Sequence, residues 1–335
     1  MFKNFLRPIA IMLVSIIVAG IVFSVLINKK IKNSTNGAID DVFSSAVSTK
    51  KDIERPLCVL IIGRDKISYL ADVIMLVSFD KQSGRTCVLQ IPRDTYAEYG
   101  SSYCKINGML KTLGEDGMCS FFEETMDIEI DGYISLELEG FRALVDSIGG
   151  VTVNVPRNLE YSDPQQNLYI NLSEGVQILN GNQAEMLVRY RSGYARGDLD
   201  RLDMQKRFLA AFFIQLKEKI TPLSIYSIAG SAIPFLKTDI SPTDLVSIGL
   251  KIINVDSSDI RIATLAGEDA VSQISGGSFY VISAPSACEM FETYFGADGR
   301  EFDKNGYFLH PSLDSFQKIY QKRVENRVFL ASELK

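Results

Sequence analysis

The sequence predicts an α/β protein: a single domain with a central mixed β-sheet flanked by helices, preceded by an N-terminal transmembrane helix. Short apolar runs predict the sheet, since LCVLIIG at 57–63 is continuous and ends at glycine, as strands buried on both faces do. Amphipathic helical patterns such as 199–220 alternate with these runs along the chain. The uncharged stretch 8–27 predicts the membrane helix, because about twenty helical residues at about 1.5 Å each reach the roughly 30 Å of a bilayer core.

The membrane span also sets the expected domain organisation. Residues 1–7 are a short cytoplasmic N-terminus, 8–27 the span, 28–55 a polar linker, 56–320 the folded domain and 321–335 a C-terminal tail. A cleavable signal peptide is the alternative, but its apolar region is usually shorter, about 7–15 residues, and no Ala-x-Ala-like site follows the span. Lysines lie on both sides of the span, and the positive-inside rule taken alone would put the domain in the cytoplasm.

Composition excludes several classes of function. The chain has 335 residues and a net charge of −6, which argues against a nucleic-acid binder with a broad basic surface. His310 is the single histidine and lies in a polar segment, so we interpret it as a surface residue rather than a zinc ligand or a catalytic base. The five cysteines fit no metal motif. Cys104 and Cys119 lie in polar surroundings and are candidates for a disulfide if the domain is exported.

The elements of the domain are expected in a mixed order. A strand at 57–63 is followed by strands at 72–80 and 86–92, which the turn KQSGR joins as a hairpin. The segment 133–156 predicts a strand, a helix, a glycine stop and another strand. The remaining expected elements are helices at 181–191, 199–220 and 241–253 and strands at 259–267 and 278–283.

The stretch VRYRSGYARGDLDRLDMQKRF concentrates arginine in an otherwise acidic chain. Arg201 and Gln205 are four residues apart and share a helix face, whereas Arg189 and Arg191 come before that helix starts. A helix N-terminus beside planar, forked guanidinium groups is suited to binding phosphate. The alternative is an ordinary charged surface helix with pairs of opposite charge four residues apart.

Further candidate residues follow the predicted strands. Arg93 ends the strand at 86–92 in IPRDT, and ligands of α/β folds gather at the carboxyl ends of strands. Asp65 and Asp72 flank the first turn, and two carboxylates together with a substrate phosphate can hold Mg²⁺. Lys105 in KING is another cation. Together these residues predict a phosphate site with Mg²⁺, with salt-bridged strand ends as the plain alternative, and no Walker loop, dinucleotide fingerprint or kinase motif set is present.

Seven sequence blocks in one order closely resemble the LytR-CpsA-Psr (LCP) family. They are LIIGRD, ADVIMLVSFD, LQIPRDT, KING, GFRALVDSIGGVTVNVP, GVQILNGNQAEMLVRYR and GDLDRLDMQKRFL, and they span about residues 57 to 220. The resemblance implies a phosphotransferase of Gram-positive cell walls, which moves a teichoic acid or capsule-like glycopolymer from a polyprenyl-pyrophosphate lipid to peptidoglycan. It implies a single-pass protein of the cell membrane whose C-terminal domain is extracellular. The implied partners are that lipid-linked polymer, peptidoglycan and the membrane, with no nucleic acid.

The resemblance also implies roles for individual residues. Asp65 and Asp72 match the Mg²⁺ ligands, and Asp198 matches the acidic residue at the reacting group, where Arg93 and Arg191 complete the catalytic set. The implied pyrophosphate ligands are Arg93, Lys105, Arg189, Arg191, Arg201 and Gln205. Arginines that neutralise a pyrophosphate suit phosphoryl transfer, which depends on positioning and charge.

Two positions depart from the family pattern. Ile67 and Leu70 stand where the family usually has arginines, and the loop between the two aspartates looks several residues short. Arg64 or Lys66 could take the place of the missing cations. The departure favours one alternative function, a non-catalytic polyprenyl-pyrophosphate-binding or regulatory protein of the cell wall.

Two other functions and one lipid site stay open at this point. A lipid pyrophosphatase would differ from a transferase only in whether water or a sugar hydroxyl attacks. An intracellular attenuator of transcription is favoured by the lysines after the span and disfavoured by the acidic charge balance. The apolar residues of the helix 199–220 either belong to the core or line a deep pocket for a prenyl tail; they are Leu202, Leu209, Phe212, Phe213 and Leu216.

Overall fold

The computed structural model describes residues 55–80, 82–99, 102–164, 168–190, 192, 198–219, 231–241, 244, 255–297 and 314–334. The predicted N-terminus, the membrane span and nearly all of the linker lie outside these ranges. His310 and most of the helix expected at 241–253 lie outside them as well. Within the ranges described, no helix combines the length and the apolar character needed to cross a bilayer.

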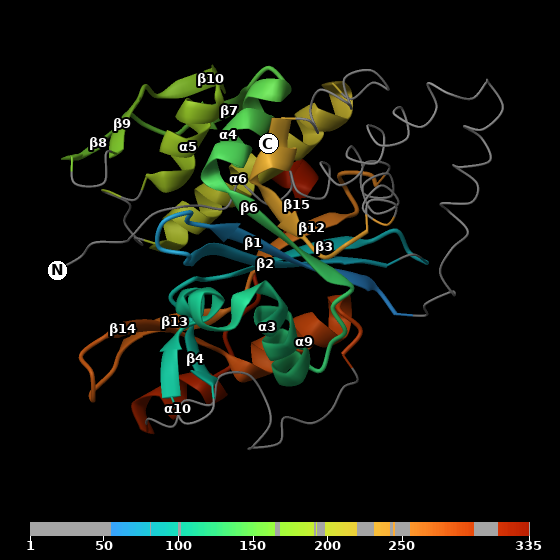
Figure 1. Cartoon of the computed structure of the whole chain (residues 1–335), viewed down its shortest axis with the longest axis vertical. Coiled ribbons are helices and arrows are strands. Elements are labelled where there is room, and N and C mark those ends of the chain that lie inside the picture. Colours follow the sequence, from blue (N-terminus) through green and yellow to red (C-terminus); the bar gives the residue numbers. More distant parts are fainter. Residues whose placement is uncertain are drawn as a thin grey trace.

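The main sheet of the described chain has seven strands and is mixed, which confirms the predicted central sheet (Figure 1). In spatial order the strands are β11 (Leu236–Thr238), β6 (Gly132–Glu137), β1 (Leu57–Arg64), β2 (Ala71–Phe79), β3 (Thr86–Ile91), β12 (Ile260–Thr264) and β15 (Val328–Leu330). β2 is antiparallel to both β1 and β3, so the expected hairpin between β2 and β3 is formed. β6 pairs in parallel with β1, and β12 pairs in parallel with β3.

The apolar runs of the sequence form the middle of this sheet because both of its faces are covered. β2 is buried along its whole length. Successive side chains of a strand point to opposite faces, so Val59 and Ile61 of β1 enter one hydrophobic core while Leu60 and Ile62 enter the other. Each fully buried aliphatic side chain of this kind contributes about 1.5–3 kcal/mol of burial free energy.

Two layers cover the sheet, one on each face (Figure 1). One layer packs on the core that contains Val59 and Ile61, called the first core here. Its helices are α4 (Leu138–Ser147), α5 (Gly181–Arg189) and α6 (Asp198–Lys219). Its two-stranded ribbons are β7 (Val151–Val155) with β10 (Gly175–Leu179), and β8 (Leu159–Asp163) with β9 (Leu168–Leu172). The layer on the other face is made of α3 (Met109–Met126), α9 (Ala284–Tyr294), α10 (Asp314–Gln321) and the hairpins β4 (Tyr96–Tyr99) with β5 (Ser102–Lys105) and β13 (Gly267–Val271) with β14 (Ser278–Ile282). The short 3₁₀ helices are η1 (Ile106–Gly108), η3 (Ile233–Phe235) and η4 (Ala331–Glu333).

The directions of the strands bring one set of strand ends together. β1, β3, β6 and β12 run parallel to one another across the sheet, so their carboxyl ends share one edge. The loop between β1 and β2 belongs to the same edge. In Figure 1 this edge is the left end of the sheet, where α6 also begins. Ligand sites of open α/β sheets are found at such an edge.

Helix α5 is fixed at its start and tied to α6 near its end. Asn180 and Gln183 form a capping box, in which each side chain accepts a backbone N–H of the other residue. Nε2 of Gln205 on α6 donates to the carbonyl of Val188 at 2.9 Å. The last turn of α5 therefore lies against the first turns of α6.

Several features differ from the expectations. Residues 321–335 were expected to be a tail, but Val328–Leu330 pairs with β12 and Ala331 is buried in the core, because the edge of β12 gains a backbone partner there. Helix α3 was not expected, since Gly114 adopts a φ of 71° inside it and breaks the helical pattern. All five cysteines are free, so the structure does not contain the candidate disulfide between Cys104 and Cys119.

Candidate phosphate-binding site

Three of the predicted site residues meet where the strands end. Asp65 follows β1, Asp72 lies near the start of β2, and Arg93 comes just after β3. Nη1 of Arg93 donates to Oδ1 of Asp72 at 2.8 Å, and both side chains are almost fully buried. This bond fixes Arg93 at the sheet edge.

Asp65 is held by the loop that it begins. Its Oδ1 accepts the N–H groups of Ile67 at 2.6 Å and Ser68 at 2.9 Å. Its backbone N–H donates to the carbonyl of Leu70 at 3.0 Å, which closes the loop. These contacts orient the Asp65 carboxylate within the loop.

The two aspartates suit one kind of metal site. No group of three or more His, Cys, Asp or Glu side chains that could hold a metal ion occurs among the described residues. Mg²⁺ is usually held by one or two protein carboxylates and completes its shell with water and substrate phosphates. Asp65 and Asp72 bracket one short loop between paired strands, so the donor set fits a Mg²⁺ ion that a phosphate helps to bind.

Lys105 is brought to the same strand end by the fold of the KING segment. The N–H of Asn107 donates to the carbonyl of Arg93 at 3.2 Å, so KING lies directly against PRDT. Nζ of Lys105 forms an ion pair with Asp94 at 2.9 Å and lies 5.9 Å from the ring centroid of Phe279. Lys105 and Arg93 therefore belong to one site.

The junction of α5 and α6 supplies two more arginines and a glutamine. Arg189, Arg201 and Gln205 are 5%, 5% and 1% exposed, which is unusual for such side chains. Nη1 of Arg189 donates to Glu185 at 2.5 Å, and Arg142 donates to the other oxygen of Glu185 at 2.8 Å. Nε of Arg189 has no hydrogen-bond partner among the described residues. A buried donor left this way costs free energy until a ligand or water accepts from it.

The side chains of two predicted site residues are not placed. Arg191 lies outside the described residues. Asp198 is the first residue of α6, but its side chain is not among those described. In Figure 1 the start of α6 lies at the same end of the sheet as the loop between β1 and β2.

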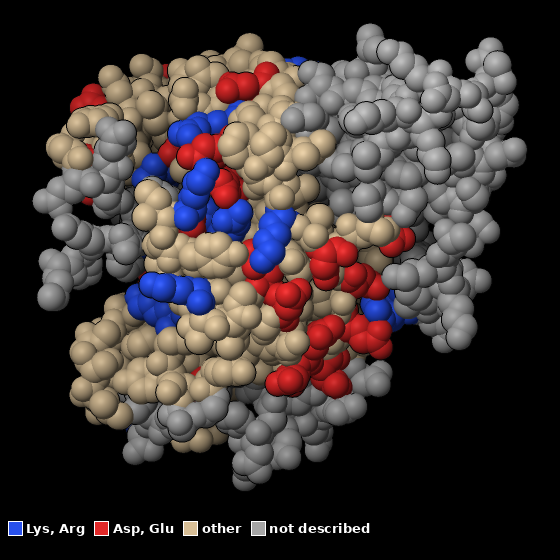
Figure 2. Space-filling view, viewed as in Figure 1, with Lys and Arg blue, Asp and Glu red and all other residues tan. Residues whose placement is uncertain are grey.

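The surface charge follows this arrangement. Figure 2 shows Lys and Arg side chains gathered in the left centre of the view, over the sheet edge where α6 begins. Asp and Glu side chains gather to the right and below, over α3 and the segment that leads to β6. The positive charge of this acidic protein is therefore local on this face, as an anion site requires.

Two carboxylates of the site were not predicted from the sequence. Glu137, at the end of β6, forms ion pairs with Arg64 at 2.8 Å and with Lys66 at 3.4 Å. The two cations that were offered as replacements for the missing arginines therefore share one carboxylate. Glu137 and Arg64 meet only through pairing of β1 with β6, which the sequence does not reveal, whereas the spacing of Glu185 and Arg189 on one helix was a readable signal.

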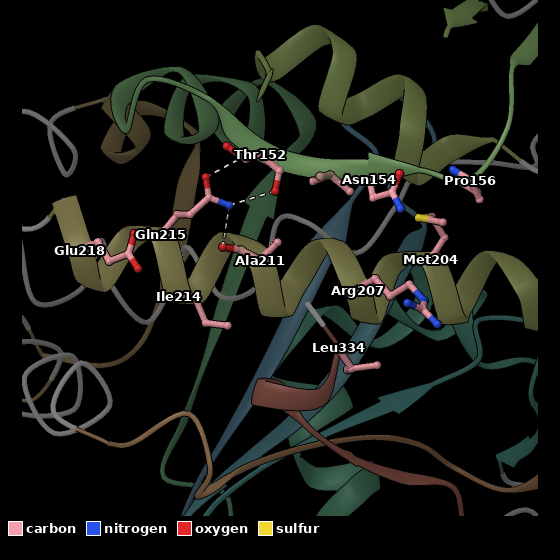
Figure 3. A pocket seen from close by; sticks show the side chains of 11 residues that line it. Thr152, Asn154, Pro156, Met204, Arg207, Ala211, Ile214, Gln215, Glu218 and Leu334 are labelled. Carbon is pink, nitrogen blue, oxygen red and sulfur yellow. Dashed lines mark hydrogen bonds between the residues drawn. The ribbon is translucent and has the colours of Figure 1, made fainter. Parts of the chain in front are cut away.

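The apolar residues proposed from the sequence for a prenyl-tail pocket lie in the first core. Leu202, Leu209 and Leu216 are nearly inaccessible, as are the two phenylalanines between them. A pocket of about 600 Å³ does lie on α6, but another face of the helix lines it (Figure 3). In that pocket the side-chain amide of Gln215 bonds both the N–H and the carbonyl of Thr152, at 2.8 and 3.0 Å. The residues predicted to hold a prenyl tail therefore do not line this pocket.

Comparison with known proteins identifies the family. The model of the LytR_cpsA_psr family matches residues 21–295, and this chain belongs to that family. The match confirms the resemblance drawn from the seven sequence blocks and extends it to both sides of them.

Two curated relatives carry the name polyisoprenyl-teichoic acid–peptidoglycan teichoic acid transferase. TagV of Bacillus subtilis (strain 168) is 28% identical over 204 residues, which are 59% of this chain and 52% of TagV. TagU of Oceanobacillus iheyensis is 27% identical over 270 residues, which are 74% of this chain and 81% of TagU. The chain therefore spans about half the length of TagV and about four-fifths of TagU.

A solved structure shows the same fold. The crystal structure of B. subtilis TagV superposes with a TM-score of 0.62 at 24% sequence identity. The superposition covers 72% of this chain and 96% of that chain. The α/β architecture with its central mixed sheet is thus the architecture of a family member.

Proposed function

We propose that this protein transfers a teichoic-acid-type glycopolymer from a polyprenyl-pyrophosphate lipid to peptidoglycan. Membership of the LytR_cpsA_psr family supports the proposal, as does the teichoic acid transferase activity for which TagV and TagU are named. The observation that carries it is the burial of Arg189, Arg201 and Gln205 in a site where Nε of Arg189 lacks a partner among the described residues. Buried guanidinium groups of this kind match the forked geometry of phosphate oxygens.

Each of these polar side chains has a role in the proposal. Arg189, Arg201 and Gln205 bind the pyrophosphate from the helix side, and Arg93 and Lys105 bind it from the strand side. Phosphoryl transfer needs its charge spread over fixed donors rather than a covalent partner on the protein. Arg191 completes the pyrophosphate ligands, and the carboxylate of Asp198 acts near the attacking hydroxyl; both assignments come from the family pattern.

The proposed metal is Mg²⁺, held by Asp65 and Asp72. A bound Mg²⁺ would neutralise charge on the pyrophosphate and orient it. Oδ1 of Asp65 is already oriented by the loop N–H groups, and Asp72 is already held by Arg93. The protein's own part is to keep both carboxylates in place before the metal arrives.

The proposal places the domain outside the cell membrane. The uncharged segment 8–27 would anchor it as a single span, and the lipid pyrophosphate would reach the site from the bilayer. Peptidoglycan, the acceptor, lies on that side of the membrane. The positive-inside pattern of the lysines favours the opposite orientation, and the family's activity outweighs it.

The proposal is tested by transfer with purified full-length protein in detergent. We expect polymer from the pyrophosphate-linked lipid to appear on added peptidoglycan and the product to vanish when Mg²⁺ is chelated. Asp65→Asn should raise the Mg²⁺ concentration needed, because asparagine keeps an acceptor for the loop N–H groups but loses the charge. The matched control is Asp256→Asn, because Asp256 is an exposed aspartate in a turn that is distant in sequence from Asp65 and Asp72.

Two results would replace the proposal with an alternative. Lipid monophosphate formed equally with and without peptidoglycan would show that water is the acceptor, as in a lipid pyrophosphatase. Tight binding of the lipid without turnover at any Mg²⁺ concentration would show a binding or regulatory protein. The absence of arginine at Ile67 and Leu70 is the feature that would explain the second result.

A further inference from the structure

Tyr69 adopts an unusual backbone conformation in the loop between the two aspartates. Its φ is 53°, in the left-handed region that residues other than glycine seldom enter. Its N–H donates to the carbonyl of Asp65 at 3.0 Å, so the unusual conformation is part of the closure of the loop. Such a conformation persists where the surroundings hold it, and it is often found at functional sites.

The side chain of Tyr69 is held by a buried carboxylate on α3. Its hydroxyl donates to Glu115, with O···O distances of 3.0 and 3.3 Å to the two carboxylate oxygens. Glu115 is 1% exposed and also binds Nζ of Lys237 on β11 at 2.6 Å. Burial alone would raise the pKa of Glu115, but its bonds to Lys237 and Tyr69 hold that pKa below the ordinary value. Glu115 is thus an ionised, fixed acceptor for the hydroxyl.

The kink in α3 puts Glu115 in this position. Gly114, the residue before it, has a φ of 71° and a ψ of −176°, so the helix restarts at Glu115. An added Cβ at Gly114 would meet no other atom within 4 Å, so the conformation, not space, calls for glycine there.

The ring of Tyr69 has a second contact in the site. The guanidinium carbon of Arg64 lies 5.3 Å from the ring centroid, within the range of a cation–π interaction. Arg64 also forms the ion pair with Glu137. One tyrosine therefore links the Asp65 loop, the cation beside it and a buried anchor on another element.

We propose that Tyr69 is the positioning residue of the aspartate loop: with its hydroxyl fixed by Glu115, it closes the short loop so that Asp65 and Asp72 converge on Mg²⁺, and it holds Arg64 beside the pyrophosphate. The inference rests on the proposed function. It would account for a site built around a loop that looks short beside the family pattern, with Ile67 and Leu70 where that pattern has arginines. Arg64 supplies the cation from the end of β1 instead of from within the loop.

The test is Mg²⁺-dependent binding of inorganic pyrophosphate to the full-length protein, measured by calorimetry beside the melting temperature. Tyr69→Phe removes only the hydroxyl. It should weaken Mg²⁺-dependent binding about 10-fold, which corresponds to about 1.4 kcal/mol, while the melting temperature without ligand changes little. Glu115→Ala should weaken binding to the same extent, although it should also lower the melting temperature because it removes the charged partner of Lys237. Glu115→Gln should restore most of the binding, because the amide oxygen still accepts from the tyrosine hydroxyl.

A double variant and a control separate positioning from general damage. Tyr69→Phe combined with Glu115→Ala should bind no more weakly than the worse single variant, because both remove the same contact. Tyr169→Phe is the matched control, since Tyr169 is an exposed tyrosine on β9, and it should bind like wild type.

The outcomes distinguish this inference from the proposed function. If wild type binds Mg²⁺ with pyrophosphate and Tyr69→Phe and Glu115→Ala bind equally well, Tyr69 does not position the loop, and the proposed function stands. A lower melting temperature with unchanged binding would likewise reduce the contact to a structural one. If wild type shows no Mg²⁺-dependent binding, the proposed function is wrong, and the inference is wrong with it.

Discussion

In the proposed site, the surroundings of Arg189 would keep a single buried cation ready for an anion. Glu185, four residues earlier on α5, accepts from one Nη and offsets the charge while the site is without ligand. Arg142 donates to the same Glu185, so the carboxylate is shared between two guanidinium groups and does not cancel Arg189 alone. Nε of Arg189 has no partner among the described residues and is the donor that a phosphate oxygen can take.

Removing this side chain should weaken the binding of pyrophosphate strongly. Each charge-assisted hydrogen bond contributes about 1.5–3 kcal/mol, so Arg189→Ala should weaken binding about 10- to 150-fold. Arg189→Lys should be nearly as harmful, because lysine keeps the charge and loses the planar fork. Calorimetry with inorganic pyrophosphate and Mg²⁺ measures both variants.

The control for this experiment is Arg207→Ala. Arg207 is an exposed arginine on α6 and lines the pocket of Figure 3. It should bind pyrophosphate like wild type. Normal binding by a well-folded Arg189→Ala protein would show that the cluster is a structural ion-pair network rather than an anion site.

The cations of the candidate site left a signal in the sequence, whereas its anions did not. Arginine concentrated in an acidic chain is a local signal, and it pointed to Arg189 and Arg201, which the structure buries at the junction of α5 and α6. Glu137 and Glu115 gave no such signal, because each acquires its role from a partner brought close by strand pairing or by a kinked helix. The pairing of these two glutamates with their cations depends on tertiary structure, which cannot be read from a single sequence.

Among the helices and strands, those with a long and uniform apolar pattern were predicted correctly from the sequence. β1, β2 and β3 are continuous apolar runs and were predicted, including the hairpin. β15 has three residues and is a strand only because β12 offers it an edge. α3 was missed because Gly114 and Gly117 interrupt its helical pattern.

The contact between α3 and β11 predicts a pH dependence of stability. The folded pKa of Glu115 is lowered, in spite of burial, by its bonds to Lys237 and Tyr69. A carboxyl with a lowered folded pKa stabilises the fold above its unfolded pKa, and the contribution disappears as pH falls through the folded value. The melting temperature of wild type should therefore fall more steeply between about pH 5 and about pH 3 than that of Glu115→Gln.

An exposed glutamate gives the comparison for this acid titration. Glu325→Gln changes a solvent-exposed carboxyl and should leave the shape of the wild-type curve intact. Wild type and Glu115→Gln curves that run parallel through the acid range would mean that Glu115 is not stabilised in its charged form.

The whole domain is a sheet between two hydrophobic cores. On the face shown in Figure 2, basic and acidic side chains gather in separate regions. The positive region lies over the sheet edge where α6 begins, and the negative region lies over α3 (Figure 2). A polyanionic polymer attached to a pyrophosphate in the site would be repelled by the negative region. We therefore expect the polymer to leave the site on the side away from α3.

The proposed topology is a prediction about the whole molecule. A protease added to intact protoplasts should remove residues 57–335, because the proposal places the domain outside the membrane. The fragment that remains should be short and membrane-bound, and it is detected with a tag at the N-terminus. A cytoplasmic protein of the same cells serves as the control for intact protoplasts, and full protection of the domain would reverse the topology.

The place of β15 at the rim of the sheet would have a consequence for export, if the domain lies outside the membrane as proposed. The ribosome makes β1, β2 and β3 early, yet the sheet gains its outermost strand only when Val328–Leu330 arrives beside β12. Ala331 and Leu334, which follow, fill the same core as Val59 of β1. A chain threaded across a membrane from its anchor would thus expose the unfinished flank of β12 until this late segment had passed. Truncation after residue 321 would leave that flank of β12 without its partner strand.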